Sequence, residues 1–129
     1  MKVVVMAPHP DDDILGVGGT ILKHVKNKDE VFLVFITRGS DKDYNEEMLK
    51  EKRKEAENVS RSLGVKKTFF CNFIAAELDK VPQNDINNTL RKIIQECNPE
   101  IAYIPHKGDL HKDHKIIIDA CMVVLRPNR

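Results

Sequence analysis

Two clusters of histidine and aspartate lie far apart in this sequence, and each follows a short apolar stretch. Residues 9–12 (His-Pro-Asp-Asp) come after apolar residues 3–7, and residues 111–114 (His-Lys-Asp-His) come after residues 101–105. Apolar, β-branched runs of this length bounded by proline predict buried strands. Because open α/β sheets form their sites at the carboxyl ends of strands, we expect both clusters at such ends.

The residue types in the two clusters favour metal-assisted hydrolysis. Zinc held by three protein ligands, with one position open, lowers the pKa of a bound water to about 7 and so supplies a nucleophile for an unactivated amide. We interpret His9, Asp12 and His114 as ligands of such an ion. Adjacent side chains point in different directions, so Asp11 is interpreted as the general base. Asp113 lies between two histidines and could hold an imidazole N–H.

The elements that must position these clusters alternate between strand and helix. The alternation predicts βαβ units and therefore an α/β fold, a Rossmann-like three-layer αβα sandwich with a mainly parallel sheet. Gly64 is expected to end the second helix. A carboxylate such as Asp12 or Asp13 could also cap the first helix. We expect strands at 2–7, 31–36, 68–71 and 101–104 and helices at 14–28, 45–63, 85–97 and 116–125, with 72–83 unassigned.

Composition and charge narrow the class of protein further. The 129 residues are 41% hydrophobic and 32% charged, which is typical of one globular domain. A net charge of +1 gives no general attraction to nucleic acid or to a membrane surface. No apolar segment reaches the roughly 18 residues of a transmembrane helix. Three widely spaced cysteines favour reduced thiols, so we expect a cytoplasmic protein.

Further motifs give the sequence a family resemblance. With residues 16–20 (Gly-Val-Gly-Gly-Thr) and a helix that carries Arg53 and ends at Leu63-Gly64, the two clusters resemble the PIG-L/LmbE-like family of zinc-dependent N-acetylglucosaminyl deacetylases. The resemblance runs from the first strand to about Asp119. It implies removal of acetyl from a small-molecule acetamido-sugar conjugate of the N-acetylglucosamine type. The cofactor implied is Zn²⁺, although such a ligand set also accepts Fe²⁺ and other divalent ions.

The resemblance also implies roles for individual residues, and it supports the ligands and the base named above. It implies that His111 stabilises the oxyanion and protonates the leaving amine, and that Asp113 tunes His111. Asp109 matches a position that orients a catalytic group. Arg53 and Arg38 would contact the substrate.

The sequence departs from the family pattern at two residues of the motifs and in the length of the chain. Asp13 stands where the family commonly has glutamate, and Lys112 stands where proline is frequent. Family members usually continue for tens of residues past the second cluster, whereas this chain ends one helix later. We therefore expect residues 1–129 to form a single deacetylase domain that is short or truncated at its C-terminus. Alternatively, a neighbouring subunit of a homo-oligomer supplies the missing wall of the substrate pocket.

Three other functions are alternatives to this hypothesis. A dinucleotide-binding Rossmann domain does not fit, because Gly16, Gly18 and Gly19 lack the spacing of the nucleotide fingerprint. A metal-dependent phosphoesterase with two metals about 4 Å apart normally needs more carboxylate ligands than the three or four available in these clusters. A non-catalytic zinc-binding remnant would bind zinc without turning over any acetamido sugar. Release of amine, of phosphate or of neither separates these alternatives.

Overall fold

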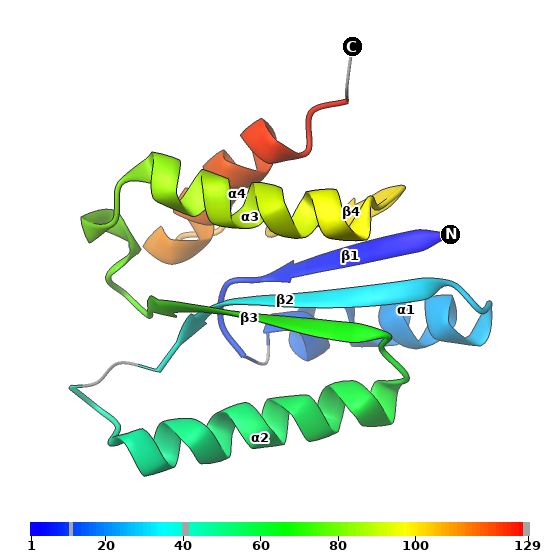
Figure 1. The fold of residues 1–129 in the computed structure, drawn as a ribbon, viewed down its shortest axis with the longest axis horizontal. Coiled ribbons are helices and arrows are strands. Elements are labelled where there is room, and N and C mark those ends of the chain that lie inside the picture. Colours follow the sequence, from blue (N-terminus) through cyan, green and yellow to red (C-terminus); the bar gives the residue numbers. More distant parts are fainter. Residues whose placement is uncertain (11, 40–41, 128–129) are drawn as a thin grey trace.

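A four-stranded parallel sheet forms the centre of the molecule (Figure 1). The computed structural model describes residues 1–10, 12–39 and 42–127, with only the backbone course of 13–15. The strands lie in the order β3-β2-β1-β4, and every neighbouring pair is parallel. Along the chain the elements are β1 (Lys2–Ala7), α1 (Asp12–Lys26), β2 (Glu30–Arg38), α2 (Glu46–Leu63), β3 (Lys67–Ile74), the 3₁₀ turn η1 (Leu78–Lys80), α3 (Gln83–Cys97), β4 (Ile101–Tyr103) and α4 (Lys112–Val124).

Helices cover both faces of the sheet, which confirms the predicted three-layer α/β fold. Helices α1 and α2 lie on one side and α3 and α4 on the other (Figure 1). Alternate residues of β1 face the two layers: Val4 packs in the core under α3 and α4, and Val3 and Val5 pack in the core with α1 and α2. Because β1 and β2 are central strands with both faces covered, their sequences are apolar without alternation.

The strand order creates a switch point beside β1. The chain proceeds from β1 to β2 and β3 on one side of the sheet, and then crosses to place β4 against the other side of β1. In open α/β sheets, ligand sites form where neighbouring strands send their connections in opposite directions. The two histidine–aspartate clusters follow β1 and β4, so both lie at this position.

Most predicted elements form, and the differences lie at their ends. The αL conformation of Gly64 (φ 83°) ends α2 as predicted. Helix α1 begins at Asp12 and is interrupted at Val17, whose backbone is not helical (φ −136°, ψ 20°). Helix α4 begins at Lys112, four residues before the predicted start, because its polar first turn gives no apolar periodicity. Among the described residues, no helix combines the length and apolar character needed to cross a membrane.

Candidate metal centre and adjoining cavity

A tight turn after β1 positions the first cluster. The backbone N–H of His9 donates to Oδ2 of Asp12 at 2.8 Å, and the N–H of Asp12 donates to the carbonyl of His9 at 3.2 Å. The start of this turn is tied to β2, because the hydroxyl and N–H of buried Thr37 both donate to the carbonyl of Pro8, at 2.7 and 3.0 Å. The start of the turn is therefore fixed to β2, and the two hydrogen bonds between His9 and Asp12 close it.

The connection from β4 to α4 positions the second cluster. The N–H of Asp109 donates to the carbonyl of His106 at 2.9 Å, and Oδ1 of Asp109 accepts the N–H of His111 at 2.9 Å. Helix α4 is capped by His111, whose Nδ1 accepts the N–H of Asp113 at 3.1 Å. His114 lies in the first turn of this helix and faces the turn after β1.

Three donor atoms from His9, Asp12 and His114 converge at one point. Oδ2 of Asp12 lies 3.2 Å from Nε2 of His114 and 3.5 Å from Nδ1 of His9, and the two ring nitrogens are 3.4 Å apart. Tetrahedral zinc bonds of about 2.0–2.1 Å separate neighbouring ligand atoms by roughly 3.3 Å. The three separations match that value, so these side chains could hold a metal ion without rearrangement.

Two further carboxylates hold the outer nitrogens of the two histidine ligands. Oδ2 of Asp113 lies 2.7 Å from Nε2 of His9, and Oδ2 of Asp109 lies 2.8 Å from Nδ1 of His114. An ionised carboxylate only accepts hydrogen bonds, so each outer nitrogen carries the ring proton. The inner nitrogens are left with lone pairs directed toward the same point. This carboxylate–histidine arrangement is typical of metal ligands in proteins.

The charges of the cluster support one another electrostatically. Burial lowers the pKa of His9, but its hydrogen bonds to Asp12 and Asp113 outweigh this effect and the net pKa is raised. Burial likewise raises the pKa of Asp12, and the hydrogen bonds from His9 together with the nearby His114 bring it below its usual value. The backbone hydrogen bond from His111 lowers the pKa of Asp109. These shifts favour ionised carboxylates beside a protonated His9 ring, so a metal ion would displace the proton from Nδ1 of His9.

His111 lies beside the cluster and is exposed to solvent. Because its Nδ1 accepts a backbone hydrogen bond, its neutral ring carries the proton on Nε2, which is available to a substrate. Asp113 is buried under α4, and its carboxylate contacts the ring of His9, one of the imidazoles it was expected to hold, and the backbone N–H of Ala76. A carboxylate oxygen of Asp113 and ring nitrogens of His9 and His111 lie within 4.8 Å of one another.

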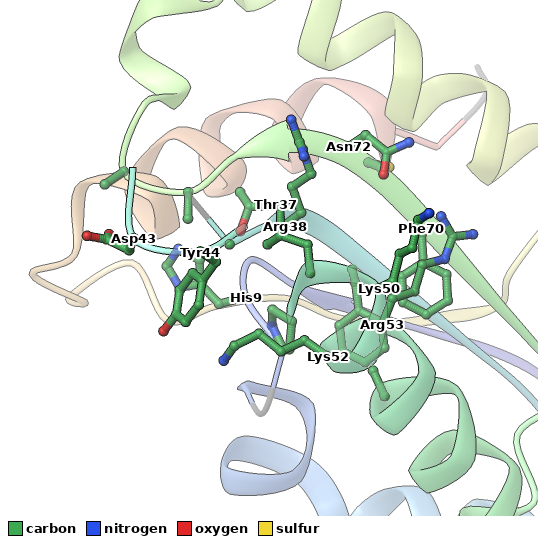
Figure 2. Close-up of a pocket in the computed structure, with 18 of the residues that line it drawn as sticks. His9, Thr37, Arg38, Asp43, Tyr44, Lys50, Lys52, Arg53, Phe70 and Asn72 are labelled. Carbon is green, nitrogen blue, oxygen red and sulfur yellow. The ribbon is translucent and has the colours of Figure 1, made fainter. Parts of the chain in front are cut away.

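A cavity of about 910 Å³ adjoins His9 between α2 and the ends of β2 and β3. Both predicted substrate residues, Arg38 and Arg53, line it. The Arg53 guanidinium lies 4.4 Å from the centre of the Phe70 ring, and Figure 2 shows this pair together, with Tyr44 on the other side of the cavity. The aromatic lining was not predicted, because in the sequence Phe70 gives only the signal of a buried strand residue.

Asp11, the predicted general base, lies outside the described residues. The remaining predicted site residues separate into two groups in the structure. One group meets at the metal centre or surrounds it, and it comprises His9, Asp12, Asp109, His111, Asp113 and His114. The other group, Arg38 and Arg53, lines the cavity.

The fold and this cluster define an α/β protein with three side chains that could hold a metal ion at the switch point of a parallel sheet. The family model described as PIG-L, GlcNAc-PI de-N-acetylase, matches residues 4–125. The chain therefore belongs to the PIG-L family, as its motifs predicted.

Individual relatives point in the same direction. Diacetylchitobiose deacetylase of Thermococcus kodakarensis is 32% identical over 124 residues, which cover 88% of this chain and 45% of the relative. The uncharacterized deacetylase YaiS of Escherichia coli is 28% identical over 96% of this chain and 68% of its own length. The structure of N,N'-diacetylchitobiose deacetylase from Pyrococcus horikoshii superimposes with a TM-score of 0.79 at 31% identity, covering 98% of this chain and 51% of that one. The chain thus spans about half the length of two of these three relatives.

Proposed function

We propose that this chain is a zinc-dependent N-deacetylase that removes acetyl from a conjugate of the N-acetylglucosamine type. The observation that carries the proposal is the convergence of His9, Asp12 and His114, with separations of 3.2–3.5 Å, beside a large cavity. Relatives named as deacetylases of diacetylchitobiose support the same chemistry.

The donor set favours one metal ion over two. Asp109 and Asp113 face the outer ring nitrogens, which leaves Asp12 as the inward-facing carboxylate among the described residues of the cluster. Sites for two metals about 4 Å apart use bridging and additional carboxylates. A phosphoesterase of that kind is therefore less well supported than an amide hydrolase.

Each residue of the centre has a defined task in amide hydrolysis. Zinc, when bound, supplies a Lewis acid and lowers the pKa of water to about 7. Asp11, by its place in the sequence, would accept the proton of the attacking water. Nε2–H of the exposed His111 would donate first to the developing oxyanion and then to the leaving amine. Asp109 keeps His111 and His114 in place through both of its oxygens.

The cavity gives the sugar conjugate a binding place next to His9. The cavity is lined by apolar and aromatic side chains and by cationic side chains. Aromatic faces pack against the apolar faces of sugar rings, while Arg38 and Arg53 offer donors to hydroxyl or anionic groups. We assign these two arginines to substrate binding on this basis.

Two broader expectations belong to the same proposal. The three cysteines are free and buried, which favours a reducing compartment such as the cytoplasm. Association into a homo-oligomer would add surface to the cavity, and analytical ultracentrifugation of the purified chain tests it directly.

The metal content of the purified chain is the first test. We expect about one zinc or iron per chain by mass spectrometry, and loss of that metal in His114→Ala. The matched control is Lys115→Ala, an exposed neighbour on α4, which should keep the metal. Metal-loaded protein should release free amine from acetamido sugars such as diacetylchitobiose.

The catalytic assignment is tested by Asp11→Asn. This variant should retain the metal and lose roughly 10²–10⁴-fold in turnover, the usual contribution of a general base. Full turnover by Asp11→Asn would show that the base is another group. Metal-free protein that takes up no added zinc would refute the enzyme proposal, and phosphate release without amine release would favour the phosphoesterase.

A further inference from the structure

A single carboxylate oxygen of Asp113 serves two partners from different parts of the fold. Oδ2 lies 2.7 Å from Nε2 of His9, which follows β1, and 2.7 Å from the backbone N of Ala76, which follows β3. The Asp113 side chain is only 2% exposed. Hydrogen bonds to a buried, charged acceptor are among the stronger ones in proteins. Asp113 therefore joins a metal ligand to a turn that is 67 residues further along the chain.

The backbone of Ala76 is held in an unfavourable conformation at this contact. Its φ is 61°, in the left-handed region that residues with a Cβ rarely adopt. The turn is closed on both sides, because the N–H of Ala75 donates to the carbonyl of Arg38 at 3.1 Å and the N–H of Glu77 to that of Ile74 at 3.2 Å. The Ala76 N–H donates to Asp113 from within this turn, at the residue whose backbone is left-handed.

This turn is also part of the cavity wall. Ala75, Ala76 and Glu77 all line the cavity that adjoins His9. The His9 ring thus connects its inner nitrogen to Asp113, and Asp113 in turn contacts the wall of the cavity.

We propose that Ala76 is a positioning residue: its backbone N–H orients Asp113 toward His9, so that metal binding and the conformation of the cavity wall stabilise each other. The proposal rests on the metal centre of the proposed function. A cation on Nδ1 of His9 polarises the ring and strengthens donation from Nε2 to Asp113. The Asp113 carboxylate, held more firmly in this way, then fixes the turn at Ala76. By thermodynamic linkage, the factor by which metal binding favours this conformation of the turn equals the factor by which the conformation raises metal affinity.

Substitutions at position 76 and its neighbour separate backbone conformation from side-chain bulk. Ala76→Val places a β-branched residue where φ is positive, which should drive the turn out of this conformation and move the N–H from Asp113. We expect the zinc dissociation constant to rise about 10-fold or more, the usual effect of losing a group behind a metal ligand. Ala76→Gly retains the N–H and favours the left-handed backbone, so its affinity should match wild type. Ala75→Val adds the same bulk to the same wall and should also bind zinc normally.

Amide hydrogen exchange of the wild-type chain tests the proposal without any substitution. Zinc should slow exchange at the Ala76 amide at least several-fold, whereas the Gly64 amide, which bonds to Arg61 at the end of α2, should not change. This readout remains decisive if Ala76→Val fails to fold. In a double-mutant cycle, the effect of Ala76→Val on zinc affinity should largely vanish in an Asp113→Asn background.

The outcomes distinguish this inference from the proposed function. Wild-type chain that binds no zinc contradicts the metal centre itself. Zinc binding with unchanged exchange at Ala76, or with Ala76→Val as tight as Ala75→Val, overturns the coupling and leaves the metal centre intact. Additive effects of Ala76→Val and Asp113→Asn would also overturn it, because the two residues would then act independently.

Discussion

Asp109 and His114 are joined by a 2.8 Å contact between Oδ2 of the carboxylate and Nδ1 of the ring. The other oxygen of Asp109 accepts the backbone N–H of His111. Asp109→Ala removes both contacts, so the His114 ring loses its orientation. We expect zinc affinity to fall about 10–100-fold, measured by competition with a chromogenic chelator.

Loss of a negative charge alone should not have this effect. Asp119→Ala removes an exposed carboxylate from the same helix, α4, and serves as the control. An equal loss of affinity in both variants would mean that long-range charge, and not the hydrogen bond to His114, sets the affinity.

His111 has two functions that substitutions can separate. Its Nδ1 caps α4, and in the neutral ring its Nε2 carries the proton. Asparagine also caps helices, so His111→Asn should unfold at nearly the wild-type urea concentration, whereas His111→Ala should lose about 1 kcal/mol. Both variants should retain zinc and lose roughly 10²–10³-fold in amine release. Normal turnover by His111→Asn would remove this residue from the chemistry.

Two glycines should respond to alanine with opposite signs. Gly64 ends α2 with φ 83°, and a Cβ there would lie 2.7 Å from Cγ1 of Val25. Gly64→Ala should therefore cost about 1–2 kcal/mol or more in the free energy of unfolding. Gly19 lies within α1 with no atom within 4 Å of an added Cβ, so Gly19→Ala should stabilise by about 0.5–1 kcal/mol. Urea unfolding of the metal-free variants measures both, and equal signs would contradict the assigned conformations.

The thiols should be inert in the folded protein. Burial raises the pKa of Cys71 to about 11 and that of Cys121 to about 12; burial, followed by the charge of Glu96, raises the pKa of Cys97 to about 11. At pH 8 the thiolate fraction is then about one in a thousand or lower. We expect Ellman's reagent to titrate almost no thiol in native protein and three after unfolding in guanidinium. Rapid reaction of Cys71 alone would show that the cavity wall beside it opens.

The sequence predicted the architecture well because its signals are local. Strands β1 and β2 are continuous apolar runs, and α2 shows clear periodicity up to its terminal Gly64. The ends were harder to predict, because the capping hydrogen bond from Asp113 to His111 starts α4 before any apolar residue appears. β3 extends to Ile74, beyond its predicted end, because pairing with β2 continues past a register shift there.

The metal centre shows where prediction from sequence ends. Residue types and strand ends were sufficient to propose His9, Asp12 and His114 as ligands. They could not show that Asp113 turns toward His9, because that choice depends on how α4 packs. A backbone amide such as that of Ala76 carries no signal in the sequence, and its hydrogen bond to Asp113 is known only from the structure.

The ligand atoms of His9 and His114 come from positions 105 residues apart. Only a chain in which β4 has docked against β1 presents both. A chain in which β4 is not docked offers just the turn after β1, so metal uptake reports that β4 is in place. Metal at a thousand times its dissociation constant would stabilise the docked arrangement by about 4 kcal/mol. A bound metal ion would thus also stabilise the docking of β4 against β1.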